Sequence, residues 1–143
     1  MDLEALALAV DERVRRPAAD RTDACLYGVR CSGAEIALEL LAEGEARRLP
    51  QNVRPPAGLC AIALSAGAWA APLEHDGSMT ARPSLHPERR RVHITTLVTG
   101  DGAECSVIRS GDGDPAVVRD GHGVLHRRLL RCWARRQPAS SRR

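Results

Sequence analysis

The chain has 143 residues, 43% of them hydrophobic, and a formal net charge of +3, which suits one domain with one core. All 21 basic residues are arginine and phenylalanine is absent, a bias typical of a GC-rich genome, so arginine abundance alone says little about partners. The longest weakly polar run, residues 57–72, is shorter than the roughly 20 residues of a membrane span, and the acidic start does not resemble an export signal. We therefore expect one domain over residues 1–136, with no membrane span and a cytoplasmic location, followed by a disordered basic tail over 137–143.

The first predicted element is a helix from Asp2 to Arg16. Asp2 is a good N-cap residue, arginines gather late in the segment, and Pro17 follows it. Apolar residues recur every three to four positions, as on one face of a helix: Leu3, Leu6, Val10 and Val14. We expect this helix to pack on the core.

Short alternating runs then predict a sheet of about five strands, with one possible extra. The runs cover residues 24–30, 34–41, 59–65, 92–99, 103–109 and 116–119. The run 34–41 is ambiguous, because Ser32 and Glu35 also form a helix capping box and the segment is rich in helix formers. We interpret it as a strand, since two short runs across a Ser-Gly turn pair easily.

The strongest strand signal lies between Arg91 and Arg109. Two β-rich runs flank Gly100-Asp101-Gly102, residue types that accept the positive backbone angles of a tight reversal. Val92, Ile94, Thr96 and Val98 alternate with His93, Thr95, Leu97 and Thr99, so both faces of this strand carry partly buried residues. The segment predicts a β-hairpin.

Two further segments complete the expected architecture. Residues 73–88 have no apolar period and predict a long surface loop. Residues 122–136 predict a basic amphipathic helix with arginines opposite its apolar side. The chain is thus expected to be an α+β domain, an antiparallel sheet flanked by N- and C-terminal helices.

Charge is concentrated at the C-terminal end, because residues 89–143 contain 12 arginines against 5 acidic residues. We therefore predict an interaction or regulatory module without catalytic residues, which binds an acidic protein through the last helix and the adjoining loop. The candidate partner-binding residues are Arg89, Arg90, Arg91, Arg127, Arg131 and Arg135. Arg89 to Arg91 are expected near the basic face of the last helix.

Two alternative functions stay open. The same arginines could bind nucleic acid without sequence readout, although few aromatic residues are available for base stacking. A small enzyme could instead have its site in the 73–88 loop, which contains His75, Asp76 and His86.

Other chemical candidates are weak. The five cysteines form no CxxC motif and are expected to be reduced, mostly buried residues. Cys60 or Cys105 could act as a nucleophile with His93 as its base, but only if the thiol were exposed and activated. His122 and His126 have the spacing of a helical metal pair but lack further ligands, and Asp112 and Asp114 form only part of a calcium loop. We therefore predict no metal or cofactor site.

Three segments, TDACLYGVR, ARPSLHPERRRVHITTLVTGDGAECSVIR and LHRRLLRC, resemble a group of small uncharacterised proteins of high-GC actinobacteria. The resemblance covers roughly residues 22–133. It implies a compact intracellular α+β fold and transfers no catalytic residues.

Overall fold

The computed structural model describes residues 2–18, 24–46, 48–71, 85–110, 113–119 and 124–138. Its elements in chain order are α1 (Leu3–Ala18), β1 (Ala24–Ser32), β2 (Glu35–Gly44), η1 (Leu49–Gln51), β3 (Ala61–Ala70), β4 (Arg90–Thr99), β5 (Glu104–Arg109), β6 (Ala116–Arg119) and α2 (Val124–Ala134). Both predicted helices and each of the predicted strand runs are present.

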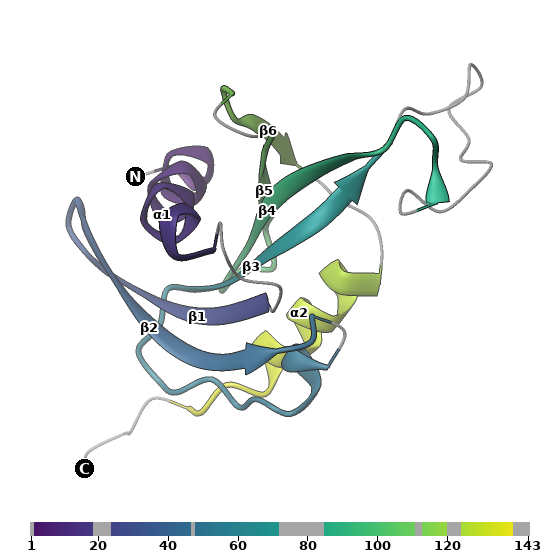
Figure 1. Ribbon diagram of the computed structural model, residues 1–143. Coiled ribbons are helices and arrows are strands. Elements are labelled where there is room, and N and C mark those ends of the chain that lie inside the picture. Colours follow the sequence, from purple (N-terminus) through teal and green to yellow (C-terminus); the bar gives the residue numbers. More distant parts are fainter. Residues whose placement is uncertain are drawn as a thin grey trace, which may run out of the picture.

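The strands form one antiparallel sheet in the order β2-β1-β3-β4-β5-β6. The helices lie on opposite sides of this sheet, and the β3–β4 ribbon extends beyond its neighbours (Figure 1). The α+β class is confirmed, with six strands where about five were expected. The order is sequential except that β1 lies between β2 and β3.

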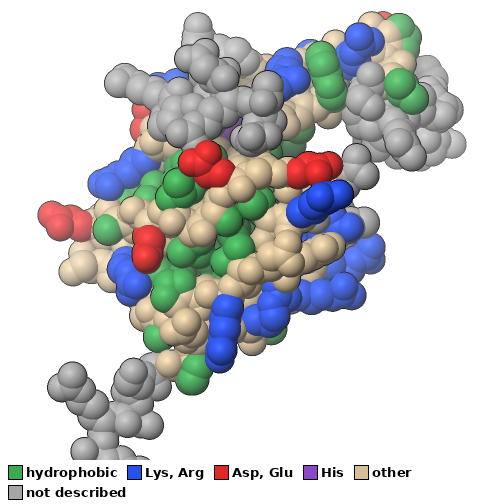
Figure 2. All heavy atoms as spheres, turned by 60° about the horizontal axis from the view of Figure 1, so that its bottom comes forward, with side chains coloured by type: hydrophobic (Ala, Val, Ile, Leu, Met, Phe, Trp, Pro, Cys, Tyr) green, Lys and Arg blue, Asp and Glu red, His purple; other side chains and the backbone are tan. Residues whose placement is uncertain are grey.

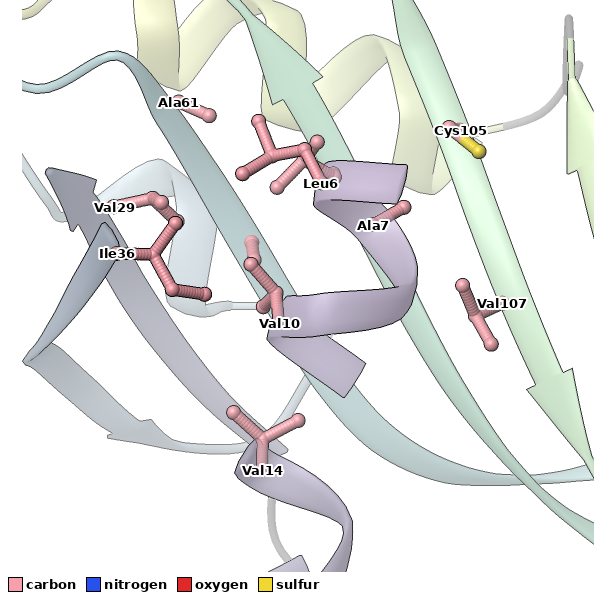
Figure 3. Close-up of a cluster of buried hydrophobic side chains, with 11 residues drawn as sticks. Leu6, Ala7, Val10, Val14, Val29, Ile36, Ala61, Cys105 and Val107 are labelled. Atoms are coloured by element: carbon pink, nitrogen blue, oxygen red, sulfur yellow. The ribbon is translucent and has the colours of Figure 1, made fainter. Parts of the chain in front are cut away.

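The core beneath α1 follows from the amphipathic pattern of that helix. Asp2 caps its start, because the backbone N–H of Ala5 donates to Asp2 Oδ1 at 2.7 Å. Figure 3 shows the helix residues lying over side chains of the sheet; the buried set includes Leu6, Ala7, Val10, Val14, Val29, Ile36, Ala61, Cys105 and Val107. The predicted packing role of this helix is confirmed.

The opposite face of the sheet packs against α2. Leu129, Cys132 and Trp133 of the helix are buried. Their partners come from β1, β3, β4 and η1: Ala24, Leu26, Leu49, Ile62, Leu64 and Val98. The sheet is therefore covered on both sides, and each strand of its centre contributes alternate residues to two different cores.

Residues 35–41 of the predicted run 34–41 lie in β2, so the interpretation as a strand is confirmed. Ile36 is 8% exposed and packs beneath α1, whereas all the remaining residues of β2 are more exposed. Pairing with β1 outweighs the helix propensity of this segment. The strand runs three residues further than predicted, to Gly44, and β3 likewise extends to Ala70.

The β4–β5 hairpin turns through residues 100–103, as predicted. The N–H of Gly102 donates to Thr99 O and the N–H of Thr99 donates to Ala103 O, both at 3.0 Å. Gly102 has φ of 84°, a conformation that residues with a Cβ adopt at a cost.

Replacing Gly102 by alanine is expected to lower the free energy of unfolding by about 1–2 kcal/mol. No atom lies within 4 Å of the position that the new Cβ would take, so the cost is conformational. Asparagine tolerates positive φ better, and Gly102→Asn should therefore cost less. Urea denaturation of both variants measures the difference; equal losses would contradict this explanation.

The cysteines depart from expectation at one place. Cys31, at the end of β1, forms a disulfide with Cys60, which immediately precedes β3. The expectation that all five are reduced is therefore wrong for this pair, because the β1–β3 pairing brings two residues that are distant in sequence together. Cys25, Cys105 and Cys132 are buried and are not in a disulfide, as predicted.

Candidate functional site

The sheet separates Arg91 from the predicted partner-binding arginines of α2. Arg91 pairs with Trp69 across β3 and β4, and both side chains point to the α1 side of the sheet because side chains alternate along a strand. Arg127 and Arg131 belong to α2, on the other side. Arg91 therefore lies on the opposite side of the sheet from the α2 arginines, so the expected proximity does not hold for this residue.

Arg89 and Arg91 both stack on Trp69. Their guanidinium carbons lie 5.1 and 5.5 Å from the centre of the indole ring, distances typical of cation–π contacts. Trp69 is nonetheless 39% exposed, and Arg90, between the two arginines, is also exposed. We call Trp69, Arg89 and Arg91 the arginine–tryptophan stack.

The arginines of α2 differ in what holds them. Arg127 and Arg131 are exposed. Arg135 instead donates to the backbone carbonyl groups of Pro50 and Val53, so it joins the helix end to the segment after η1. Figure 2 looks onto this side of the molecule and shows arginine side chains gathered at its lower right.

None of the six predicted arginines forms an ion pair with a carboxylate among the described residues. By contrast, Arg30 pairs with Glu39 and Arg48 with Glu45, at 3.4 and 3.5 Å. The charges of the candidate arginines are thus not compensated by carboxylates of the described residues. These arginines can therefore bind an external anion.

A second polar site lies under α1 and was not predicted. Asp11 is completely buried, and its Oδ1 accepts a hydrogen bond from Thr95 Oγ1 at 2.8 Å. Arg109 Nε donates to Asp11 Oδ2, and His93 Nδ1 lies 3.5 Å from Oδ1. On the other side of the imidazole, His93 Nε2 lies 2.7 Å from Ser65 Oγ. We call these five residues the Asp11 cluster.

The Asp11 carboxylate is ionised despite its burial. Burial raises the pKa of this group, but the contact with His93 and the hydrogen bonds from Arg109 and Thr95 lower it more, so the pKa of Asp11 lies below its ordinary value. The cluster therefore holds a fixed negative charge beside the His93 ring.

The order of atoms in this cluster matters chemically. With the proton of the neutral ring on Nδ1, facing Asp11, His93 Nε2 is the acceptor for the Ser65 hydroxyl proton. This arrangement of hydroxyl, imidazole and carboxylate is the one by which a serine is activated as a nucleophile.

The sequence offered His93 as a base only for Cys60 or Cys105, and only if one of these thiols were exposed and activated. Cys60 is in the disulfide. Cys105 lies opposite Leu97, four residues from the His93–Arg109 pair, or about 13 Å along the strand, and burial raises the pKa of its thiol. The available signal was Asp11 itself, an acidic residue one position from Val10 and three from Val14 on the apolar side of the helix.

The remaining candidates gain no support. Residues 72–84 with His75 and Asp76, as well as Asp112, His122 and the side chain of His126, lie outside the described residues. Within the described chain, His86 Nδ1 accepts from the backbone N–H of Glu88 and Asp114 is exposed. No group of three potential metal ligands occurs in that part of the chain, and no helix described there is long and apolar enough to cross a bilayer.

Comparison with known proteins adds no family to this description, because no protein-family model, curated protein or solved structure matches the chain.

Proposed function

We propose that the chain is an interaction module that binds an acidic surface of another protein through its unpaired arginines. The observation that carries this proposal is that no described carboxylate compensates the charges of the candidate arginines. Six arginines lie at the ribbon end, on α2 and directly after α2, and none has a carboxylate partner among the described residues.

The arginine–tryptophan stack supports this role because it limits the freedom of its arginines before binding. A guanidinium that rests on an indole ring keeps its N–H groups available for a carboxylate. Ordering the side chain in advance reduces the entropy lost on binding. Exposed tryptophan and arginine are also the residues most enriched at the centre of protein interfaces.

Non-specific nucleic-acid binding is the second candidate, and one observation favours it. Trp69 is exposed between two arginines, a combination that stacks bases and contacts phosphates in single-strand binders. The distribution of the arginines favours a protein partner, since the sheet lies between the stack and Arg127 with Arg131, whereas a bound strand needs a continuous basic track.

The test is charge reversal on each side of the sheet. Arg127→Glu with Arg131→Glu, and separately Arg89→Glu with Arg91→Glu, are expected to weaken capture of the partner at low salt by roughly tenfold or more, a loss of about 1.4 kcal/mol for each factor of ten. Co-purification from the native cells, with the bound material identified, provides the measurement.

A control variant makes the same change in charge elsewhere. Arg13 on α1 and Arg119 on β6 are exposed, and Arg13→Glu with Arg119→Glu should retain the partner. If both reversed pairs bind as the unmodified protein does, the proposal is wrong. If the captured material is nucleic acid that dissociates at high salt, the second candidate replaces it.

A further inference from the structure

We propose that Ser65, His93 and Asp11 form a hydrolytic site for small carboxylic esters, an activity separate from partner binding. Ser65 Oγ lies 2.7 Å from His93 Nε2, and His93 Nδ1 faces Asp11 Oδ1 at 3.5 Å. Ser65 is the nucleophile, His93 the base, and Asp11 the group that orients the ring and stabilises its protonated form.

Three elements hold these groups in place. Asp11 comes from α1, Ser65 from β3 and His93 from β4, and the pairing of Ser65 with Thr95 fixes the register of the two strands. Thr95 and Arg109 hold the carboxylate from two further directions. The catalytic geometry therefore depends on regular structure and not on a loop, which favours precise positioning.

Gly67, the next residue along the same face of β3, allows Arg91 to approach this site closely. Gly67 pairs with His93 and has no side chain, and a Cβ built there would lie 3.1 Å from the guanidinium of Arg91. The Arg91 guanidinium thus lies over Gly67, on the same face of the sheet as Ser65 and His93. It can stabilise the negative oxygen that develops when an ester carbonyl is attacked.

Solvent access to the site is restricted but present. Ser65 is 2% exposed, whereas the side chain of His93 is 17% exposed and Gly67 is exposed. A small ester can therefore approach Ser65 past the exposed edge of the imidazole. Partial exclusion of water strengthens the electrostatic contacts within such a site.

Water is the only reagent that the reaction needs besides the ester. The Ser65 oxygen forms a bond to the carbonyl carbon while its proton moves to His93 Nε2. The bond to the alkoxy oxygen then breaks, and the alcohol leaves with that proton. Water next attacks the acyl group on Ser65 and gives a proton to His93, which returns it to the serine oxygen as the carboxylic acid is released.

A fluorophosphonate probe tests the nucleophile directly. The serine oxygen forms a bond to phosphorus as fluoride leaves, so the native protein should gain one adduct that peptide mass spectrometry places on Ser65. Release of 4-nitrophenol from 4-nitrophenyl acetate should fall at least about 100-fold in Ser65→Ala and in His93→Gln.

Ser106 provides the matched control, because it is a partly buried serine in β5 whose hydroxyl donates to Glu104 Oε1 at 2.8 Å, away from any described histidine. Ser106→Ala should keep both the adduct and the esterase rate. Circular dichroism establishes that each variant is folded. Absence of the adduct from the folded native protein, or equal rates in native protein and Ser65→Ala, would overturn the proposal without affecting the arginine surfaces.

Discussion

Replacing Asp11 by alanine is expected to lower the free energy of unfolding by about 3–5 kcal/mol. The carboxylate is fully buried and compensates Arg109, whose side chain is only 14% exposed, while it also accepts from Thr95. Its removal leaves a largely buried guanidinium and a buried hydroxyl without their partner. Urea denaturation of both proteins at neutral pH gives the difference.

Glu12 is the control for this prediction, since it is the next residue of α1 and also contacts Arg109, at 3.3 Å. Its side chain is 55% exposed, and exposed ion pairs contribute at most about 1 kcal/mol. Glu12→Ala should therefore lose far less stability. Similar losses for the two variants would show that burial of Asp11 is not the cause.

The contribution of Asp11 to the free energy of unfolding should also fall as the solution becomes strongly acidic. Its pKa in the folded protein is lower than the ordinary 3.8, so the ionised group stabilises the fold above that value. This contribution is lost as the pH falls through the lower folded pKa. The stability gap between the native protein and Asp11→Asn should therefore narrow in strongly acidic solution; a constant gap would contradict the pKa direction.

Loss of the Cys31–Cys60 disulfide is expected to lower the free energy of unfolding by about 3–4 kcal/mol. The bond joins residues separated by 29 positions, and closing a loop of that length restricts the unfolded chain by roughly this amount. The variant Cys31→Ser with Cys60→Ser, compared with the native protein in urea, measures the loss.

Reducing agent gives an independent control for the disulfide. Reduction should bring the native protein to the stability of the double variant and leave the double variant unchanged. Because disulfides persist mainly in oxidising compartments, the redox state of this pair in the cell also tests the expectation of a cytoplasmic location. Free thiols at both positions in freshly isolated protein would contradict the bond.

Most of the fold could be predicted from the sequence because residue types in its strands alternate strongly between the two faces. The period-two pattern in β4 separated His93, Thr95 and Leu97 from Val92, Ile94 and Val98, and the structure packs Leu97 beneath α1 and Val98 against α2. The boundaries of β2 and β3 were less predictable, because Gly44 and Trp69 resemble loop and end residues until their pairing with neighbouring strands is known.

The sites were harder to predict because they depend on pairing between distant segments. Ser65 and His93 are 28 residues apart, and Asp11 is 84 residues from its partner Thr95. No local pattern indicates such proximity. Trp69 likewise acquires its arginines only through the register of β3 against β4, whereas the arginines themselves were visible in the charge distribution.

The position of the disulfide has a consequence for how fast the chain can fold. Every other strand pair joins consecutive elements, whereas β1 must meet β3 across β2 and η1. Pairings distant in sequence slow folding because loop entropy is lost before contacts form. The Cys31–Cys60 bond lies directly beside the Val29–Ala61 pair. Once oxidised, the chain keeps these two strands close even when unfolded, so refolding should bypass the slowest search in the topology.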